Sequence, residues 1–111
     1  MTHMLSAEMR SCIDNCHACA TVCLSDAIQH CLAKGGKHTE PRHFKLMLDC
    51  AEICHTAANF IARGSDHLGH ICRECAEICR ACADSCEALG DMSECVDACR
   101  RCAESCEKMA A

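Results

Sequence analysis

Residues 72–86 read CRECAEICRACADSC and place five cysteines in fifteen positions. The cysteines follow one another in steps of three, four, three and four residues. Steps of three and four return to one face of an α-helix, whereas a half-buried strand would need steps of two. This stretch therefore predicts a helix with a stripe of thiols along one side.

The same pattern recurs along the chain, which identifies it as a repeated unit. Three copies of C-x3-C-x2-C-x3-C begin at Cys12, Cys75 and Cys95. A fourth copy begins at Cys50 and keeps the first two cysteines, but it has Ala57 and Ile61 at the other two positions. Because each copy has the period of a helix, we expect four helices that share one cysteine-rich inner face.

Glycine and proline mark the breaks between these helices. Gly35 and Gly36 end the first helix, and Pro41 suits the first turn of the second. Gly64 and Gly90 lie where glycines commonly follow the last turn of a helix. We therefore expect helices near residues 6–34, 41–63, 66–89 and 92–109.

The start of the last helix and the short connections complete the predicted fold. Asp91 and Glu94 have the spacing of a capping box. Short connections make successive helices antiparallel. The sequence therefore predicts an all-α protein, an antiparallel up-down-up-down four-helix bundle with a cysteine-lined core, as a single domain over residues 1–111.

The composition limits the classes of function. The chain has 111 residues, 16 Cys, 8 His and a net charge of −5, and only 17 residues are Val, Ile, Leu or Phe. We expect no nucleic-acid partner, because no basic stripe is visible, and no membrane partner, because no long apolar run is present. The N-terminal residues do not resemble a signal peptide, so we expect a cytoplasmic protein whose thiols stay reduced.

The spacing of the thiols favours metal binding over disulfides. Cysteines four apart on a helix have Cβ atoms about 5–6 Å apart, whereas a disulfide needs about 3.5–4.5 Å. Two metal–sulfur bonds of about 2.3 Å in a line place the sulfurs about 4.6 Å apart, which such a pair can reach. Soft thiolates select Cu(I), and the seven C-x3-C pairs are linked by C-x2-C steps.

Two other kinds of thiol chemistry remain open at this point. Zinc would also bind, as a zinc-thiolate store, although it prefers discrete sites of four ligands. A redox protein that uses thiols or an iron–sulfur cluster is the second alternative, although the ferredoxin run is C-x2-C-x2-C-x3-C-P. An enzyme is not expected, because sixteen similar thiols single out no nucleophile.

The repeated C-x3-C pairs on four predicted helices, with Met and His on the same stripes, resemble the bacterial copper storage proteins, and specifically their cytosolic branch. The resemblance implies a four-helix bundle that stores many Cu(I) ions per chain, and homotetramers of such bundles. It also implies metal-binding roles for the inward cysteines. These are Cys12, Cys16, Cys19, Cys23, Cys31, Cys50, Cys54, Cys72, Cys75, Cys79, Cys82, Cys86, Cys95, Cys99, Cys102 and Cys106.

The two ends of the predicted bundle differ in chemistry. One end collects Cys31 and the candidate metal-entry residues His30, His43, Met47 and Met92. The other end collects Leu5, Met9, Ile61, Leu68 and Met109. Since imidazole and thioether groups can pass a soft ion inward, we expect metal to enter at the first end. His38, His67 and His70 lie in or near turns, and we expect them on the surface.

A second apolar stripe lies one residue away from the cysteine stripe of the first helix. It consists of Ile13, Ala20, Leu24, Ile28 and Leu32. The stripe is either an ordinary flank of the bundle or a contact between bundles, and the second interpretation agrees with the homotetramer that the resemblance implies. Met1 and Met4 precede this helix, and we expect them at a frayed end.

Overall fold

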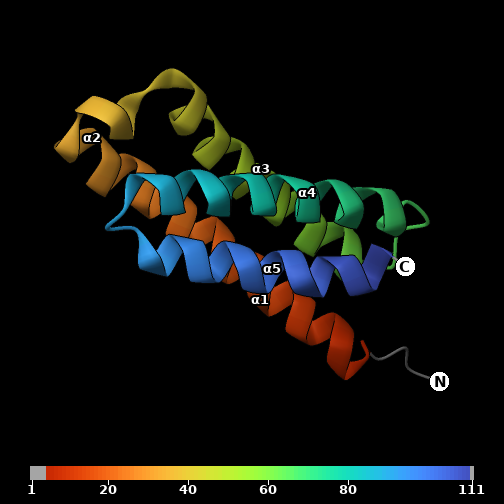
Figure 1. The fold of residues 1–111 in the computed structure, drawn as a ribbon. Coiled ribbons are helices and arrows are strands. Elements are labelled where there is room, and N and C mark those ends of the chain that lie inside the picture. Colours follow the sequence, from red (N-terminus) through yellow and green to blue (C-terminus); the bar gives the residue numbers. More distant parts are fainter. Residues whose placement is uncertain (1–4, 111) are drawn as a thin grey trace.

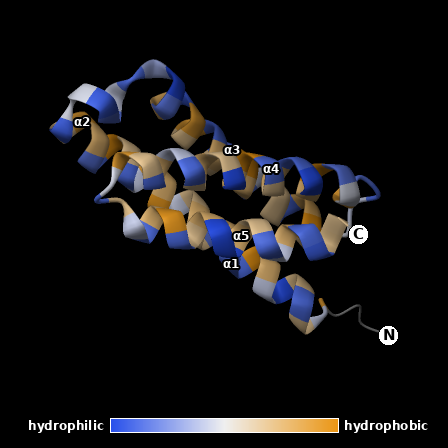
Figure 2. Ribbon diagram, viewed as in Figure 1, coloured by the Kyte–Doolittle hydropathy of each residue, from blue (hydrophilic) through white to orange (hydrophobic). Residues whose placement is uncertain are grey.

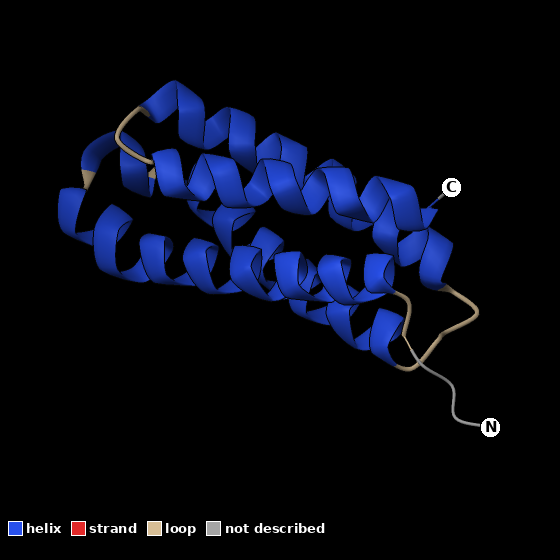
Figure 3. Cartoon of the chain, turned by 90° about the horizontal axis from the view of Figure 1, so that it is seen from below, coloured by secondary structure: helices blue, strands red, loops and turns tan. Residues whose placement is uncertain are grey.

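The computed structural model describes residues 5–110, so Met1 and Met4 lie outside the described residues. The elements are α1 (Ala7–Ser25), the π-helix η1 (Asp26–Cys31), α2 (Leu32–Lys34), the 3-10 helix η2 (Gly36–Thr39), α3 (Pro41–Ala62), α4 (Leu68–Leu89) and α5 (Ser93–Ala110). Within residues 5–110 there is no strand (Figure 3). None of these helices is apolar over a length that would cross a membrane.

The helices form an elongated bundle with principal extents of 54 × 20 × 17 Å. Helix α1 packs against α3 and α5, and α4 packs against the same two helices from the other side. Successive long helices run in opposite directions, and both described ends of the chain lie at one end of the bundle (Figure 1). The predicted antiparallel four-helix bundle is thereby confirmed.

The first long helix is continuous from α1 through η1 to α2, and its π-helical part is a feature that the sequence did not predict. Cys23, Ala27 and Cys31 are all fully buried, although they are separated by two steps of four. In a regular α-helix, two such steps would drift about 80° around the axis. The wider turns of a π-helix hold more residues each, so η1 keeps Cys31 facing the core.

The ends of the helices show why the chain turns where it does. At the start of α1, the Ser6 side chain accepts a hydrogen bond from the Met9 amide. At the start of α3, the Glu40 side chain accepts one from the Arg42 amide. These side chains satisfy amides that have no partner within the helix. Gly64 ends α3 at φ 63° in the left-handed region, which glycine adopts without strain. The four helical stretches begin and end close to the expected positions, the largest difference being the start of α4 at Leu68.

The predicted capping box at Asp91 and Glu94 is wrong. Helix α5 begins at Ser93, and the first carbonyl that accepts a helical hydrogen bond is that of Met92, from the Val96 amide. Asp91 has φ 47° and lies in the turn before the helix, with its carboxylate directed at Lys34 and His30. The left-handed turn therefore takes Asp91 away from the amides that it would have capped.

The core is built almost wholly of cysteine and alanine. All sixteen cysteines are buried, together with Met47, Ile61 and Met92 among the larger side chains. Buried alanines flank the cysteines, among them Ala20, Ala51, Ala76, Ala83 and Ala103. Apolar and polar residues alternate along each ribbon with the helical period (Figure 2). Because Ala and Cys are small, the four helices approach closely enough to bring their thiols into contact.

Candidate metal site

The thiol column consists of the sixteen cysteines, all of which are free and have no exposed surface. Each long helix contributes its stripe to this column, because steps of three and four keep the thiols on the face that meets the other helices. Neighbouring sulfurs lie 3.4–4.0 Å apart. Such a set of soft donors, closed off from water, suits soft metal ions.

The closest sulfur neighbours lie mainly on different helices, which the spacing within one helix could not show. An unbroken path of contacts crosses between helices at every step. It runs Cys12–Cys106–Cys16–Cys102–Cys54–Cys79–Cys50–Cys19–Cys99–Cys23–Cys95–Cys86. Within helices, the C-x3-C pairs that begin at Cys19, Cys75 and Cys95 have sulfurs 3.9–4.0 Å apart.

Groups of four thiols overlap along the column. In each group the four sulfurs lie within 4.8 Å of one another. Two such groups are Cys19/Cys50/Cys54/Cys79 and Cys19/Cys23/Cys50/Cys99. The two groups share Cys19 and Cys50, so a thiolate at these positions could bridge two ions. The geometry therefore suits a connected cluster better than isolated four-ligand sites.

Met47 interrupts the thiols near one end of the column. Its sulfur lies 3.3 Å from the Cys86 sulfur, 3.7 Å from that of Cys82 and 3.9 Å from that of Cys95. The side chain is fully buried, as its place on the α3 stripe predicts. A thioether is a neutral, soft donor, so it can ligate a metal without adding negative charge.

The mouth of the column is the end formed by Cys31, His43 and Met92. The Cys31 sulfur lies 3.8 Å from Nε2 of His43 and 4.0 Å from the Met92 sulfur. Nδ1 of His43 pairs with the Ser85 hydroxyl at 2.7 Å, which holds the ring with Nε2 toward Cys31. Burial lowers the pKa of His43, so the ring is neutral and can ligate a metal.

One thiol at each end of the column, Cys31 and Cys12, holds its proton tightly in the metal-free chain. Burial, with the negative charge of Asp26 nearby, raises the pKa of Cys31 to about 11. The hydrogen bond with Cys106 is the main cause that raises the pKa of Cys12 to about 12. Metal binding must therefore displace protons here, because the thiolate is the ligand.

The opposite end of the column is closed by apolar groups. Ala57 and Ile61 occupy the two positions where the repeat would have thiols, and both are fully buried. Met9, Leu68 and Met109 pack against the core at this end and are partly buried. No thiol comes from α3 at this level, so the end offers fewer ligands than the rest of the column.

The other histidines within residues 5–110 lie outside the column. Nε2 of His30 faces Asp91 at 3.3 Å, so this candidate entry residue is directed at the surface rather than at Cys31. His67 and His70 are exposed, as expected. His38 is not: only 13% of its side chain is exposed, because η2 folds it against the ring of His30 at 5.3 Å between centroids. The expectation that His38 lies on the surface is therefore wrong, because its position in a turn of the sequence does not indicate that η2 packs it against His30.

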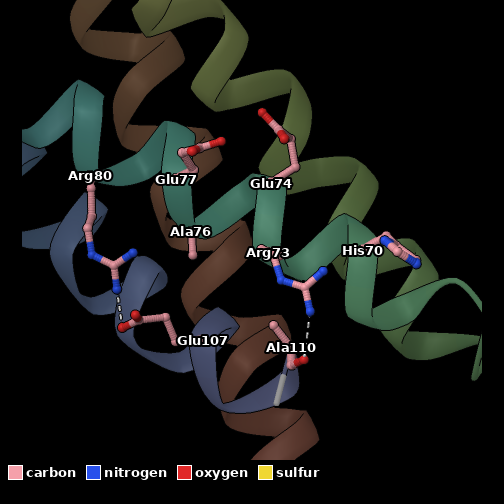
Figure 4. A pocket seen from close by; sticks show the side chains of 8 residues that line it. All are labelled: His70, Arg73, Glu74, Ala76, Glu77, Arg80, Glu107 and Ala110. Carbon is pink, nitrogen blue, oxygen red and sulfur yellow. Dashed lines mark hydrogen bonds and ion pairs between the residues drawn. The ribbon is translucent and has the colours of Figure 1, made fainter.

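Hollows on the surface differ between the two ends. Near the mouth, one hollow is lined by Cys86 and Met92 and another by His43 and Ser85. A groove outside α4 and α5 is lined by His70, Arg73, Glu74, Ala76, Glu77, Arg80, Glu107 and Ala110, without a cysteine (Figure 4). Arg80 pairs there with Glu107 across the two helices. Such paired, solvated charges form an ordinary polar surface.

A family model of the copper storage proteins matches residues 5–111. The chain belongs to the copper storage protein family. This confirms the resemblance seen in the cysteine repeats, and since the family is a metal store, it also confirms that the chain is not an enzyme. No match was found among the curated proteins.

Solved structures of similar proteins agree with the assignment to the copper storage family. A crystal structure of a Nitrosospira multiformis protein is 53% identical, with a TM-score of 0.90, and the match covers 93% of this chain and 94% of that one. The Cu(I)-bound copper storage protein BsCsp3 is 32% identical, with coverage of 94% and 99% and a TM-score of 0.84. Apo copper storage protein 3 from Bacillus subtilis is 33% identical, with coverage of 92% and 98% and a TM-score of 0.76.

Proposed function

We propose that this protein stores many Cu(I) ions in the thiol column. The observation that carries the proposal is the unbroken path of buried free thiols with sulfurs 3.4–4.0 Å apart. It is supported by membership of the copper storage family and by the likeness to a Cu(I)-bound relative. With bridging thiolates and about one ion per thiolate, the capacity is on the order of ten to twenty ions per chain.

We propose that the thiolates hold these ions by sharing sulfurs both within C-x3-C pairs and between helices. Cys19, Cys23 and Cys99 form a triangle with sulfur separations of 3.9, 3.7 and 3.5 Å. Three sulfurs placed about 2.3 Å from a central ion would be about 4.0 Å apart. The triangle is thus close to the size that three-coordinate binding needs, and a linear pair would need a small widening to about 4.6 Å.

Anaerobic titration tests the storage proposal. Cu(I) added to the fully reduced chain should be taken up well past four equivalents before an external Cu(I) indicator responds. A matched control is Ser105→Ala, which leaves every thiol in place and should keep the same capacity. Saturation at one or two equivalents would contradict storage and favour a discrete site.

Zinc storage is a second candidate, because the overlapping groups of four thiols have the ligand number that zinc prefers. Its capacity would be lower, about one ion per four thiolates. Competition separates the two: Cu(I) should displace Zn²⁺ from the column, in line with the preference of thiolates for the softer ion. A brown protein after reconstitution with iron and sulfide would instead support the electron-carrier alternative.

We propose that Cu(I) enters and leaves at the mouth. Cys31, His43 and Met92 meet there beside hollows that reach His43 and Cys86, whereas Ile61 closes the other end. His30 lies on the outer side of this entrance.

Rates of loading and removal test this direction. Replacement of His43, Met47 and Met92 together by Leu should slow loading, and removal by a chelator, with nearly unchanged capacity because the thiolates remain. The matched control replaces Met9 and Met109 by Leu at the opposite end and should change the rates much less. Greater slowing in the control would place the entrance at the other end.

We also propose a homotetramer and a cytoplasmic location. Leu24, Ile28 and Leu32 on the first helix are 47%, 47% and 53% exposed, which is unusual for side chains of this size. A contact between bundles would cover them. Replacement of all three by Gln should reduce the mass seen by light scattering, with unchanged helicity. The cytoplasmic proposal rests on the free thiols, which a reducing compartment preserves.

A further inference from the structure

A cluster of nitrogen and oxygen ligands lies on the outer side of the mouth, separate from the thiol column. Nε2 of His30 lies 3.3 Å from Oδ1 of Asp91, and Nε2 of His38 lies 3.6 Å from the same oxygen. These residues come from η1, from η2 and from the turn between α4 and α5. Two neighbouring helical segments and one turn distant in sequence thus place both histidine nitrogens beside the same Asp91 oxygen.

The two separations from Asp91 Oδ1 are those of ligands around one metal ion. Ligand atoms about 2.0–2.2 Å from a tetrahedral ion lie about 3.3–3.6 Å from one another. Both distances from Asp91 Oδ1 fall within this range. The two rings meet edge to face at an interplanar angle of 83°, with their centroids 5.3 Å apart.

An unpaired nitrogen provides the second observation. Nε2 of His38 is buried and has no hydrogen-bond partner among the described residues, because 3.6 Å is too long for a hydrogen bond to Asp91. A buried polar atom without a partner costs free energy, and a metal ion would supply the missing bond. Lys34 does not fill this role, since its ammonium pairs at 3.2 Å with the other carboxylate oxygen, Oδ2.

We propose that His30, His38 and Asp91 form a binding site for a divalent transition-metal ion, such as Zn²⁺, outside the thiol column. Two imidazoles and a carboxylate suit a borderline divalent ion, whereas the column below suits soft Cu(I). A bound ion joins the end of the first helix, η2 and the α4–α5 turn at the mouth. Met92, which contacts Cys31, directly follows Asp91 in the sequence. A metal ion bound to Asp91 would therefore restrict the motion of the segment that carries Met92.

The test uses the full chain saturated with Cu(I), so that thiolates do not compete for the probe, and in this respect it rests on the proposed function. Zn²⁺ is then added in a calorimetric titration. We expect one further equivalent of Zn²⁺ per chain in the wild type. If the column does not fill with Cu(I), storage itself fails; if it fills and no Zn²⁺ binds, only the outer site is refuted.

Two variants and one control assign the binding. His38→Gln and Asp91→Asn should each weaken Zn²⁺ binding at least tenfold. Asparagine tolerates the left-handed backbone at φ 47°, so Asp91→Asn should keep the turn, and circular dichroism checks the fold. The control replaces His17 and His55 by Gln; these exposed rings are also neighbours, at 6.1 Å, and their loss should leave the affinity within twofold.

Imidazole proton signals give an independent readout. On addition of one equivalent of Zn²⁺, the ring signals of His30 and His38 should shift together, and those of His17 and His55 should stay in place. Shifts confined to His17 and His55, or equal affinity in all variants, would overturn the assignment to Asp91.

Discussion

Replacement of Ile61 by Cys tests whether this side chain seals the end of the column away from the mouth. Ile61 is fully buried at a position where the repeat would have a thiol. The change removes about two carbon groups from the core, at about 0.8 kcal/mol each. A residual cavity of about 40–50 Å³ would add about 1 kcal/mol at about 24 cal/mol per Å³. The metal-free variant should therefore unfold with a free energy about 2–3 kcal/mol lower than that of the wild type.

The same loss should appear in the kinetics of copper removal. If release from this end requires the apolar seal to open, a loss of about 2–3 kcal/mol accelerates it by at most about 30-fold to 150-fold. Urea unfolding of the reduced chain measures the first quantity, and chelator-driven loss of Cu(I) measures the second. The extra thiol should also add up to one ion to the capacity.

Ile61→Val is the matched control, because it keeps a branched apolar side chain and adds no ligand. Its expected cost is about 0.5–1.5 kcal/mol, with a correspondingly smaller effect on release. The reasoning is refuted if Ile61→Cys loses the expected stability but releases copper no faster than Ile61→Val. In that case the end would be closed by other groups, such as the partly buried Leu68 and Met109.

Three further predictions concern the metal-free chain. Above pH 9, the ordinary pKa of a thiol, the Cys31 thiol of the unfolded chain loses its proton, whereas the folded chain retains this proton until about pH 11. The stability that Cys31 contributes should therefore be fully present below pH 9, and the free energy of unfolding should fall between pH 9 and pH 11. A free energy of unfolding in urea that does not change across this window would contradict this. Glu40→Ala removes the side chain that accepts hydrogen bonds from the Arg42 and His43 amides at 2.6 and 3.3 Å, and should cost about 1 kcal/mol in the same assay, whereas Glu40→Asp should cost less. The metal-free protein should already be helical, because protonated buried thiols pack as small apolar groups; a random-coil far-UV spectrum would instead indicate a metal-nucleated fold.

The sequence predicts some features of the candidate ligands at the mouth but not others. Met47 and Met92 lie on the predicted stripes, and both are buried, because the period of the helix sets which face they occupy. His43 lies on the same stripe, but its orientation depends on Ser85 of α4, a contact across 42 positions. Sequence spacing indicates that a residue faces inward, whereas the atom that it directs at its neighbours depends on the helix opposite.

The sequence by itself determined the helices, their inner faces and the chemistry of the core. Steps of three and four fix the inner face of each helix through local geometry, and the glycines and Pro41 fix where the chain turns. Such features depend on a few neighbouring residues. For this reason the bundle, the buried cysteines and the family could be recognised from the repeats alone.

Only the tertiary structure decided which sulfurs are neighbours. The path through the column crosses between helices at every step, so it depends on the rotation and register of each helix relative to the others. The π-helix η1 keeps Cys31 facing the core. In this segment the packing of the core favours i→i+5 hydrogen bonds over the i→i+4 bonds of an α-helix. Likewise, His30, His38 and Asp91 meet only because the turns close over the mouth; their spacing in the sequence contains no period that would predict it.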